Sequence, residues 1–154
     1  MAFEPRSHCP VNFALETIGD QWSLLILRDM IFRGKRTYNQ FLSSEEGFAT
    51  NILAARLLEL ERTGILTKRP DPSDGRKSVF ELTQKGLDLI PMIFEMMLWS
   101  AKYDPKSEAR RIKGLIEKIR ADNRKVSAKI IQAVRQGHAL LPDHLDKTPK
   151  ETHR

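Results

Sequence analysis

The chain has 154 residues, 40% of them hydrophobic, and its 26 Lys and Arg residues outnumber its 20 Asp and Glu residues, for a formal net charge of +6. Such a composition suits one compact domain with an appendage and favours polyanionic partners such as nucleic acid. A single cysteine excludes an internal disulfide framework, and because the opening residues lack the layout of a secretion signal, we expect a cytoplasmic protein.

Four helices are expected in the first part of the chain, at residues 10–19, 22–32, 37–43 and 50–63. The second, WSLLILRDMIF, is apolar on all its faces and should lie at the centre of the core. Arg28 and Asp29 interrupt it, so no apolar run approaches the ~20 residues of a membrane-spanning helix, and no membrane partner is expected. The fourth helix places Leu53, Leu57 and Leu60 on one stripe, which leaves its opposite face exposed.

A β-hairpin should follow, with strands at residues 65–69 and 77–82. Its tight turn is expected at Asp74 and Gly75, because both residues tolerate the positive φ that two-residue turns need. A long helix then runs from Thr83, a candidate N-cap, to about residue 102. Pro91 should kink this helix or lie in a locally adapted turn, since proline cannot donate the helical hydrogen bond.

This order of elements is that of a winged helix-turn-helix, in which the helix before the hairpin enters the major groove of DNA. The predicted fold is therefore mainly α with a small β-hairpin, and residues 9–102 form the DNA-binding domain. The expected partner is double-stranded DNA.

The exposed face of the fourth helix should carry the base contacts. Its small side chains allow close approach to the bases, and Asn51 can pair bidentately with adenine. Thr50 can meet a thymine methyl group or a phosphate, or it can cap the helix. Arg56 suits a phosphate contact, although it could also be an ordinary solvent-facing arginine. The DNA-contacting candidates on the helices are Arg36, Thr37, Thr50, Asn51, Ala54 and Arg56.

The hairpin tip RPDPSDGRK is rich in cations. If Asp74 accepts a hydrogen bond from Arg76, the guanidinium is held extended and loses less entropy when it enters a narrow minor groove. Arg69 and Lys77 would then be phosphate clamps that add affinity without sequence preference. The alternative is a solvated hairpin whose charges keep an exposed strand edge soluble.

Residues 107–136 read as one long helix with apolar residues near heptad spacing. The stripe consists of Ile112, Ile116, Ile119, Val126, Ile130 and Val134. One helix cannot bury this stripe alone, so we expect a homodimer in which residues 106–136 pack against the same helix, or the 10–19 helix, of a second subunit. The arm could instead pack on its own domain. Asn123 lies near the apolar stripe, where it could fix the register of helix pairing or mark a kink. Residues 137–154 should be mostly disordered.

A set of motifs spans roughly residues 9–99: the CP pair at Cys9, IGDQWSLLILRDM, TYNQFL, LAARLLELERTGIL, ELTQKG and Trp99. Together these motifs resemble the HxlR family of bacterial transcription regulators. The resemblance implies a homodimeric winged-helix repressor or activator without enzymatic activity. Two features depart from the family pattern. The wing DPSDGRK is more like that of the MarR family, and Leu58 lies where the family tends to have a polar or basic residue.

Cys9 matches a cysteine that serves some members of the resembling family as a redox or electrophile sensor. Its place before Pro10, with Arg6 and His8 nearby, should lower the thiol pKa and favour reactivity. The alternative is a small apolar residue buried at the dimer interface. In that case a small-molecule effector would bind a pocket between the DNA-binding domain and the arm.

No motif for another chemistry is visible. The histidines and Cys9 lack zinc-like spacing, and the sequence has no glycine-rich phosphate loop, clustered acid pair or nucleophile motif. We therefore expect no enzyme, no metal and no cofactor. The alternative function is a winged-helix protein-interaction module whose DNA binding is weak and indifferent to sequence.

Overall fold

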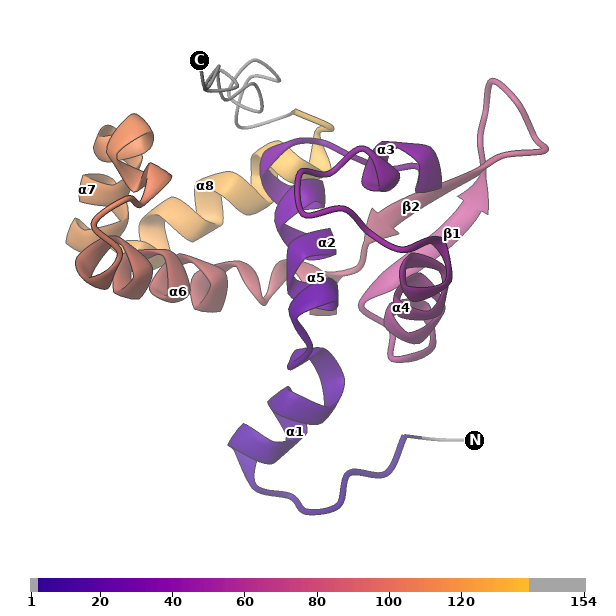
Figure 1. The fold of residues 1–154 in the computed structure, drawn as a ribbon, viewed down its shortest axis with the longest axis horizontal. Coiled ribbons are helices and arrows are strands. Elements are labelled where there is room, and N and C mark those ends of the chain that lie inside the picture. The colour runs from indigo at the N-terminus through magenta and orange to yellow at the C-terminus, as the bar shows by residue number, and fades with distance from the viewer. Residues whose placement is uncertain (1–2, 139–154) are drawn as a thin grey trace, which may run out of the picture.

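The structure, a computed structural model, describes residues 3–138 (Figure 1). Its elements are α1 (Pro10–Ile18), α2 (Gln21–Phe32), α3 (Tyr38–Leu42), α4 (Thr50–Arg62), β1 (Leu66–Pro70), β2 (Ser78–Leu82), α5 (Gln84–Leu87), α6 (Ile90–Tyr103), the 3₁₀-helix η1 (Glu108–Ile112), α7 (Lys113–Ala121) and α8 (Asn123–Arg135). The predicted fold class, mainly α with one β-hairpin, is confirmed. None of the described helices is long and apolar enough to cross a membrane.

Helix α2 lies at the centre of the core, as its sequence predicts. Asp20 caps it by accepting a hydrogen bond from the Ser23 amide, and Ile26, Leu27, Met30 and Ile31 are fully buried. The leucine stripe of α4 packs against the same core. We call the part from α1 to α5 the winged-helix unit.

The hairpin is antiparallel, with a register running from Leu66 opposite Leu82 to Pro70 opposite Ser78. It is also joined to the segment before α3, because the Phe80 amide donates a hydrogen bond to the Arg36 carbonyl at 2.8 Å. The expected two-residue turn is wrong, because the loop between the strands covers residues 71–77 and neither Asp74 nor Gly75 adopts a positive φ. The loop closes instead through the Lys77 amide, which donates to the Asp74 carbonyl at 2.9 Å.

The helix expected over residues 83–102 is divided in two. Thr83 caps α5, as predicted, by accepting a hydrogen bond from the Gly86 amide at 3.2 Å. Helix α6 then begins at Ile90, with Pro91 in its first turn, where the missing amide would have no helical partner. The constraint at Pro91 is therefore met by a new helix start and not by a kink.

The arm is not the single long helix that the heptad spacing predicted. Asp122, with φ −158° and ψ 85°, ends α7, and its side chain caps α8 by accepting a hydrogen bond from the Lys125 amide at 3.0 Å. The two helices pack against each other and against α6 (Figure 1). We call α6, η1, α7 and α8 the helical lobe.

The apolar stripe of the arm is largely buried by this folding back. Ile116, Ile119 and Val134 are buried within the chain, and the rest of the stripe, Ile112, Val126 and Ile130, is half-buried. The first three side chains thus cannot form an exposed stripe for a second subunit, because α6 and the opposite arm helix already cover them.

Asn123 joins α8 to α6 instead of lying on an intersubunit seam. Its Nδ2 donates to the Pro91 carbonyl at 3.0 Å and to Glu95 Oε1 at 2.7 Å, and its Oδ1 accepts from Ser127 Oγ at 2.9 Å. The expectation of a disordered tail falls mostly on residues 139–154, which lie outside the described part of the chain.

Candidate DNA-binding surface

The face of α4 opposite its leucine stripe is exposed and uncharged near the N-terminus. It presents Thr50, Asn51, Ala54 and Ala55 to solvent. Ala49 is the N-cap residue, so the interpretation of Thr50 as the cap is wrong. The Tyr38 hydroxyl donates to the Thr50 carbonyl at 2.9 Å and so attaches the start of α4 to α3.

Arg36 and Thr37, the candidates before α3, both have intramolecular roles. Thr37 caps α3 in a reciprocal capping box with Gln40. Arg36 Nη1 donates to the carbonyls of Met30 and Lys35 at 2.7 and 2.8 Å, and burial lowers the pKa of this guanidinium. Arg36 therefore satisfies one carbonyl in the last turn of α2 and one in the segment after it, and its side chain is not an open phosphate ligand.

Arg56 lies on α4 but is turned toward α2. Its Nη1 is 3.7 Å from Asp20 Oδ2, and its side chain is 37% exposed. This distance describes a loose ion pair, which leaves the guanidinium able to exchange Asp20 for a phosphate.

The wing has the internal contact that the sequence predicted. Arg76 Nε donates to Asp74 Oδ1 at 3.1 Å, and the Arg76 amide donates to the same oxygen at 3.2 Å. The bond from the Arg76 side chain is the main reason that the pKa of Asp74 lies below its ordinary value. The Arg76 side chain is 92% exposed, at the tip of a loop that projects from the body (Figure 1). An exposed guanidinium with a fixed direction results.

The two other wing candidates differ from each other. Arg69 pairs across the hairpin with Glu81, at 2.5 Å between Nη2 and Oε1, so part of its charge is already compensated. Lys77 is exposed. Of the two, Lys77 is the more available cation for a phosphate.

A buried charged cluster, which sequence reasoning missed, fixes the segment before α4. Asp29 is fully buried and accepts hydrogen bonds from Arg28 Nη2 at 2.8 Å, Arg33 Nη1 at 3.2 Å and Lys35 Nζ at 3.3 Å. The Ser44 hydroxyl donates to Oδ2, the oxygen that Lys35 also contacts, whereas both arginines donate to Oδ1. The only sequence signal was an acid inside an apolar helix, with arginines next to it and four residues after it.

Arg28 extends this cluster to the loop between α3 and α4. Its Nη2 donates to Glu46 Oε2 at 2.9 Å, and this bond lowers the pKa of Glu46 to about 2. Arg33 Nη2 lies 3.8 Å from Glu45 Oε1 in the same loop. The loop that leads into α4 is therefore attached to α2 through three contacts. Ser44 contacts Asp29, Glu45 lies near Arg33, and Glu46 pairs with Arg28.

Cys9 is the N-cap residue of α1 and is exposed. The backbone amides of Asn12 and Val11, at the start of α1, lower the pKa of its thiol below the ordinary value. This is the helix-start effect that the sequence predicted. Cys9 is not buried within one chain, so the alternative of a buried packing residue would require a partner subunit to cover it.

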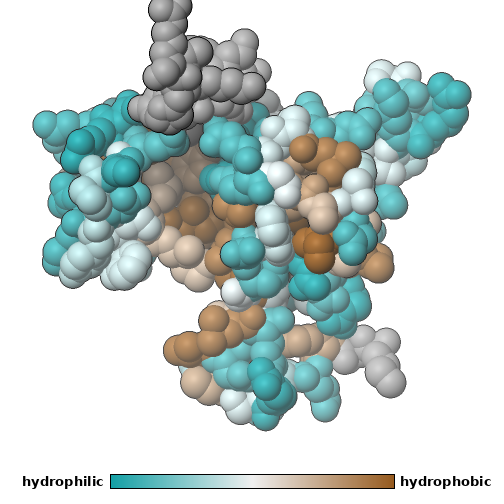
Figure 2. Space-filling model, in the orientation of Figure 1, coloured by the Kyte–Doolittle hydropathy of each residue, from teal (hydrophilic) through white to brown (hydrophobic). Residues whose placement is uncertain are grey.

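Large apolar side chains are exposed on α1 and α6. They are Val11, Phe13, Leu15, Met96, Trp99 and Tyr103. Helix α1 extends away from the body, and brown apolar atoms cover part of that projection (Figures 1 and 2). An apolar surface of this kind typically marks a site of protein association.

Three comparisons with known proteins agree on the class of fold. Residues 17–108 match the family model described as HxlR-like helix-turn-helix. HTH-type transcriptional regulator Rv3095 of Mycobacterium tuberculosis is 37% identical over 103 residues, which cover 67% of this chain and 64% of the relative, slightly less than two thirds of its length. The crystal structure of PA1607 is 36% identical with a TM-score of 0.60, and covers 67% of this chain and 72% of that one. The structure of the redox regulator HypR in its oxidised form has 30% sequence identity and a TM-score of 0.55. The match covers 61% of this chain and 96% of HypR.

Proposed function

Since this chain belongs to the HxlR-like family of helix-turn-helix transcriptional regulators, we propose that it binds a pseudo-palindromic operator in double-stranded DNA as a homodimer. Helix α4 enters the major groove and the wing reaches the adjacent minor groove. The observation that carries this proposal is the α4 surface, which is buried on its leucine stripe and exposes small uncharged residues near its N-terminus.

The base contacts in this proposal come from the first turns of α4. The Asn51 carboxamide has the donor and acceptor arrangement that pairs with adenine in the major groove. The exposed Thr50 offers a hydroxyl and a methyl group, and Ala54 leaves room for close approach. Arg56 contacts phosphate after leaving its loose pair with Asp20.

The wing supplies the minor-groove contact. Because Asp74 already orients Arg76, insertion of this side chain costs less conformational entropy than for a mobile arginine. Lys77 and Arg69 add phosphate contacts, of which Lys77 contributes more because Glu81 competes for Arg69.

The dimer in this proposal uses the exposed apolar faces of α1 and α6. The arm of residues 106–136 contributes by bracing α6, which carries Met96, Trp99 and Tyr103 on its outer side. A two-fold arrangement would place the two α4 helices about 34 Å apart, one turn of DNA.

A mobility-shift titration on the DNA upstream of the chain's own gene tests the proposal, with random DNA as competitor. Specific DNA should bind at least about 1,000-fold more tightly than random DNA. Equal affinity for both would favour the alternative, a protein-interaction module with weak non-specific DNA binding. Sedimentation of the protein alone tests the dimer separately.

The reactive features of Cys9 support a second part of the proposal, namely that oxidation of this thiol changes DNA affinity. Cys9 is exposed and its pKa is lowered, and the similar protein HypR is described as a redox regulator. With one cysteine in the chain, oxidation cannot close a disulfide within it, so the product would be an intersubunit disulfide, a mixed disulfide, an adduct or a sulfenic acid.

The test of this second part is DNA affinity before and after diamide treatment, in the wild type and in Cys9→Ser. The wild type should change its affinity and the variant should not. An unchanged wild type, with a thiol that resists alkylation in the folded protein, would refute redox control and leave operator binding unaffected.

A further inference from the structure

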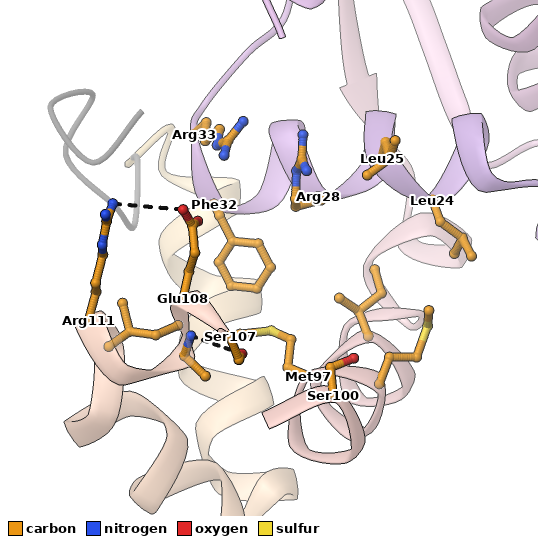
Figure 3. A pocket seen from close by; sticks show the side chains of 14 residues that line it. Leu24, Leu25, Arg28, Phe32, Arg33, Met97, Ser100, Ser107, Glu108 and Arg111 are labelled. Carbon is orange, nitrogen blue, oxygen red and sulfur yellow. Dashed lines mark hydrogen bonds and ion pairs between the residues drawn. The ribbon is translucent and has the colours of Figure 1, made fainter. Parts of the chain in front are cut away.

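A cavity of about 360 Å³ lies between the winged-helix unit and the helical lobe. Its volume falls within the ~300–1,000 Å³ typical of small-molecule sites. Figure 3 shows side chains from α2, α6 and η1 around it, and Figure 2 shows apolar surface in the recess between the two parts. The α6 and η1 walls thus belong to the lobe, and the α2 wall belongs to the unit that carries α4.

The walls of the cavity are apolar. Leu24, Leu25 and Phe32 line it from α2, Ile93 and Met97 from α6, and Ile112 from η1. Apolar walls that include a phenylalanine and a methionine suit an aromatic or alicyclic ligand body, because the thioether adapts to the shape of what it touches. Most of η1 lies beyond residue 108, where the match to the family model ends. The η1 wall is therefore supplied by this chain's own arm.

Cations dominate the polar groups of the rim. Three arginines, Arg28, Arg33 and Arg111, line the cavity together with one carboxylate, Glu108. Arg28 is committed to Asp29 and Glu46. Arg111 Nη1 instead lies 3.7 Å from Glu108 Oε1, and both of these side chains are well exposed. Such a surface pair is weak, so an acidic group on a ligand could replace Glu108 at Arg111.

The position of the cavity connects it to DNA binding. Its α2 wall is fixed by the Asp29 cluster, which also fixes the loop before α4. Its α6 wall belongs to the helix that exposes Trp99 and Tyr103. A ligand between these walls would set the angle between the DNA-contacting unit and the apolar face of α6.

We propose that this cavity is an effector site for a compact aromatic or alicyclic molecule with one acidic group, held by Arg111 and coupled to DNA affinity. The coupling rests on the proposed function, whereas ligand binding does not.

The first experiment measures binding of two fluorescent probes to the full-length protein without DNA. Anilinonaphthalene sulfonate combines an aromatic body with one acid, and N-phenylnaphthylamine has the same kind of body without the acid. The sulfonate probe should bind saturably at one site per chain and at least about fivefold more tightly than the neutral probe. Equal binding of both would overturn the assignment of an acidic ligand.

Cavity-filling and charge variants locate the site. Ser100 lies on the exposed side of α6 with its hydroxyl toward the cavity (Figure 3), so Ser100→Trp fills the space without disturbing the core. It should abolish sulfonate binding, while Lys102→Trp, on the same helix but outside the lining, should not. Arg111→Gln should weaken binding about tenfold, and the matched Arg110→Gln, also exposed but outside the lining, should leave it unchanged. Retained binding in Ser100→Trp would overturn the site.

The second experiment repeats the operator titration with saturating sulfonate probe. DNA affinity should change at least about threefold in the wild type and in Lys102→Trp, and not in Ser100→Trp. Probe binding without any effect on DNA affinity would overturn the effector role. A protein that binds the probe as expected but shows no operator preference at all would overturn the proposed function and not the ligand site.

Discussion

Replacing Asp29 by alanine should be among the most damaging single changes in the chain. The carboxylate is fully buried, and Arg28, Arg33, Lys35 and Ser44 all donate to it. Removing one partner of a buried charge cluster typically costs about 3–5 kcal/mol, because the remaining charges are left uncompensated. Small proteins have a total free energy of unfolding of about 5–15 kcal/mol, so the variant should lose a large part of it.

Thermal unfolding followed by circular dichroism measures this loss. For a chain of this size, each kcal/mol lowers the melting temperature by about 2–4 °C, so Asp29→Ala should melt roughly 6–20 °C below the wild type. Asp29→Asn should lie between the two, because the amide oxygen still accepts hydrogen bonds but carries no charge. The control is Glu59→Gln, which breaks an exposed ion pair with Arg62 and should cost less than about 1 kcal/mol. An Asp29→Ala protein that melts within about 2 °C of the wild type would refute the structural role of the cluster.

Three further predictions concern DNA recognition, acid stability and the arm. Asn51→Ala should relax base preference at one position in each half-site and cost about 1–3 kcal/mol of DNA-binding free energy. Arg76→Ala should instead weaken binding to most sequences and reduce the slope of log affinity against log salt by about 1. Anisotropy titrations on specific and random DNA measure both effects. The pKa of Glu46 is lowered to about 2 from an ordinary 4.5, so its pair with Arg28 stabilises the fold fully above pH 4.5 and loses this contribution as the pH falls through about 2. Urea unfolding should therefore find Glu46→Gln about 1–2 kcal/mol less stable than the wild type at pH 7 and equally stable near pH 2, and a constant difference would contradict the assignment. Asn123→Ala should increase hydrogen exchange in α8 and cost about 1–3 kcal/mol because the contacts to Pro91 and Glu95 are lost, while Gln132→Ala, exposed on the same helix, should have no such effect.

Most of the winged-helix unit could be predicted because its local signals agree with its tertiary contacts. The stripe of Leu53, Leu57 and Leu60 specified both the helix and its buried face, and Thr83 specified a cap. The Asp74 to Arg76 bond was predictable because it joins residues two apart in one loop. Whether Asn51 and Arg76 contact DNA stays a prediction.

The arm could not be predicted from periodicity alone. A heptad-like stripe looks the same in one long helix and in two short helices that pack against each other. The deciding residue is Asp122, whose side chain caps α8, but the surrounding residues also suit a continuous helix. The Asp29 cluster was missed for a different reason: Ser44 and Glu46 meet α2 only after the chain has turned, and no spacing in the sequence encodes that contact.

The hydrogen bond between the Phe80 amide and the Arg36 carbonyl limits which parts of this protein can move relative to one another. It fastens the hairpin to the segment before α3, and the Arg36 side chain fastens that segment to the end of α2. Helix α4 is tied to the same frame through Tyr38 and the Asp29 cluster. Helix α4 and the wing should consequently move together as a rigid body, so that in the proposed DNA complex their separation stays constant. In the proposed homodimer, a small rotation of each winged-helix unit about α6 would change the phase of the two half-site contacts around the double helix, while each contact surface keeps its own shape.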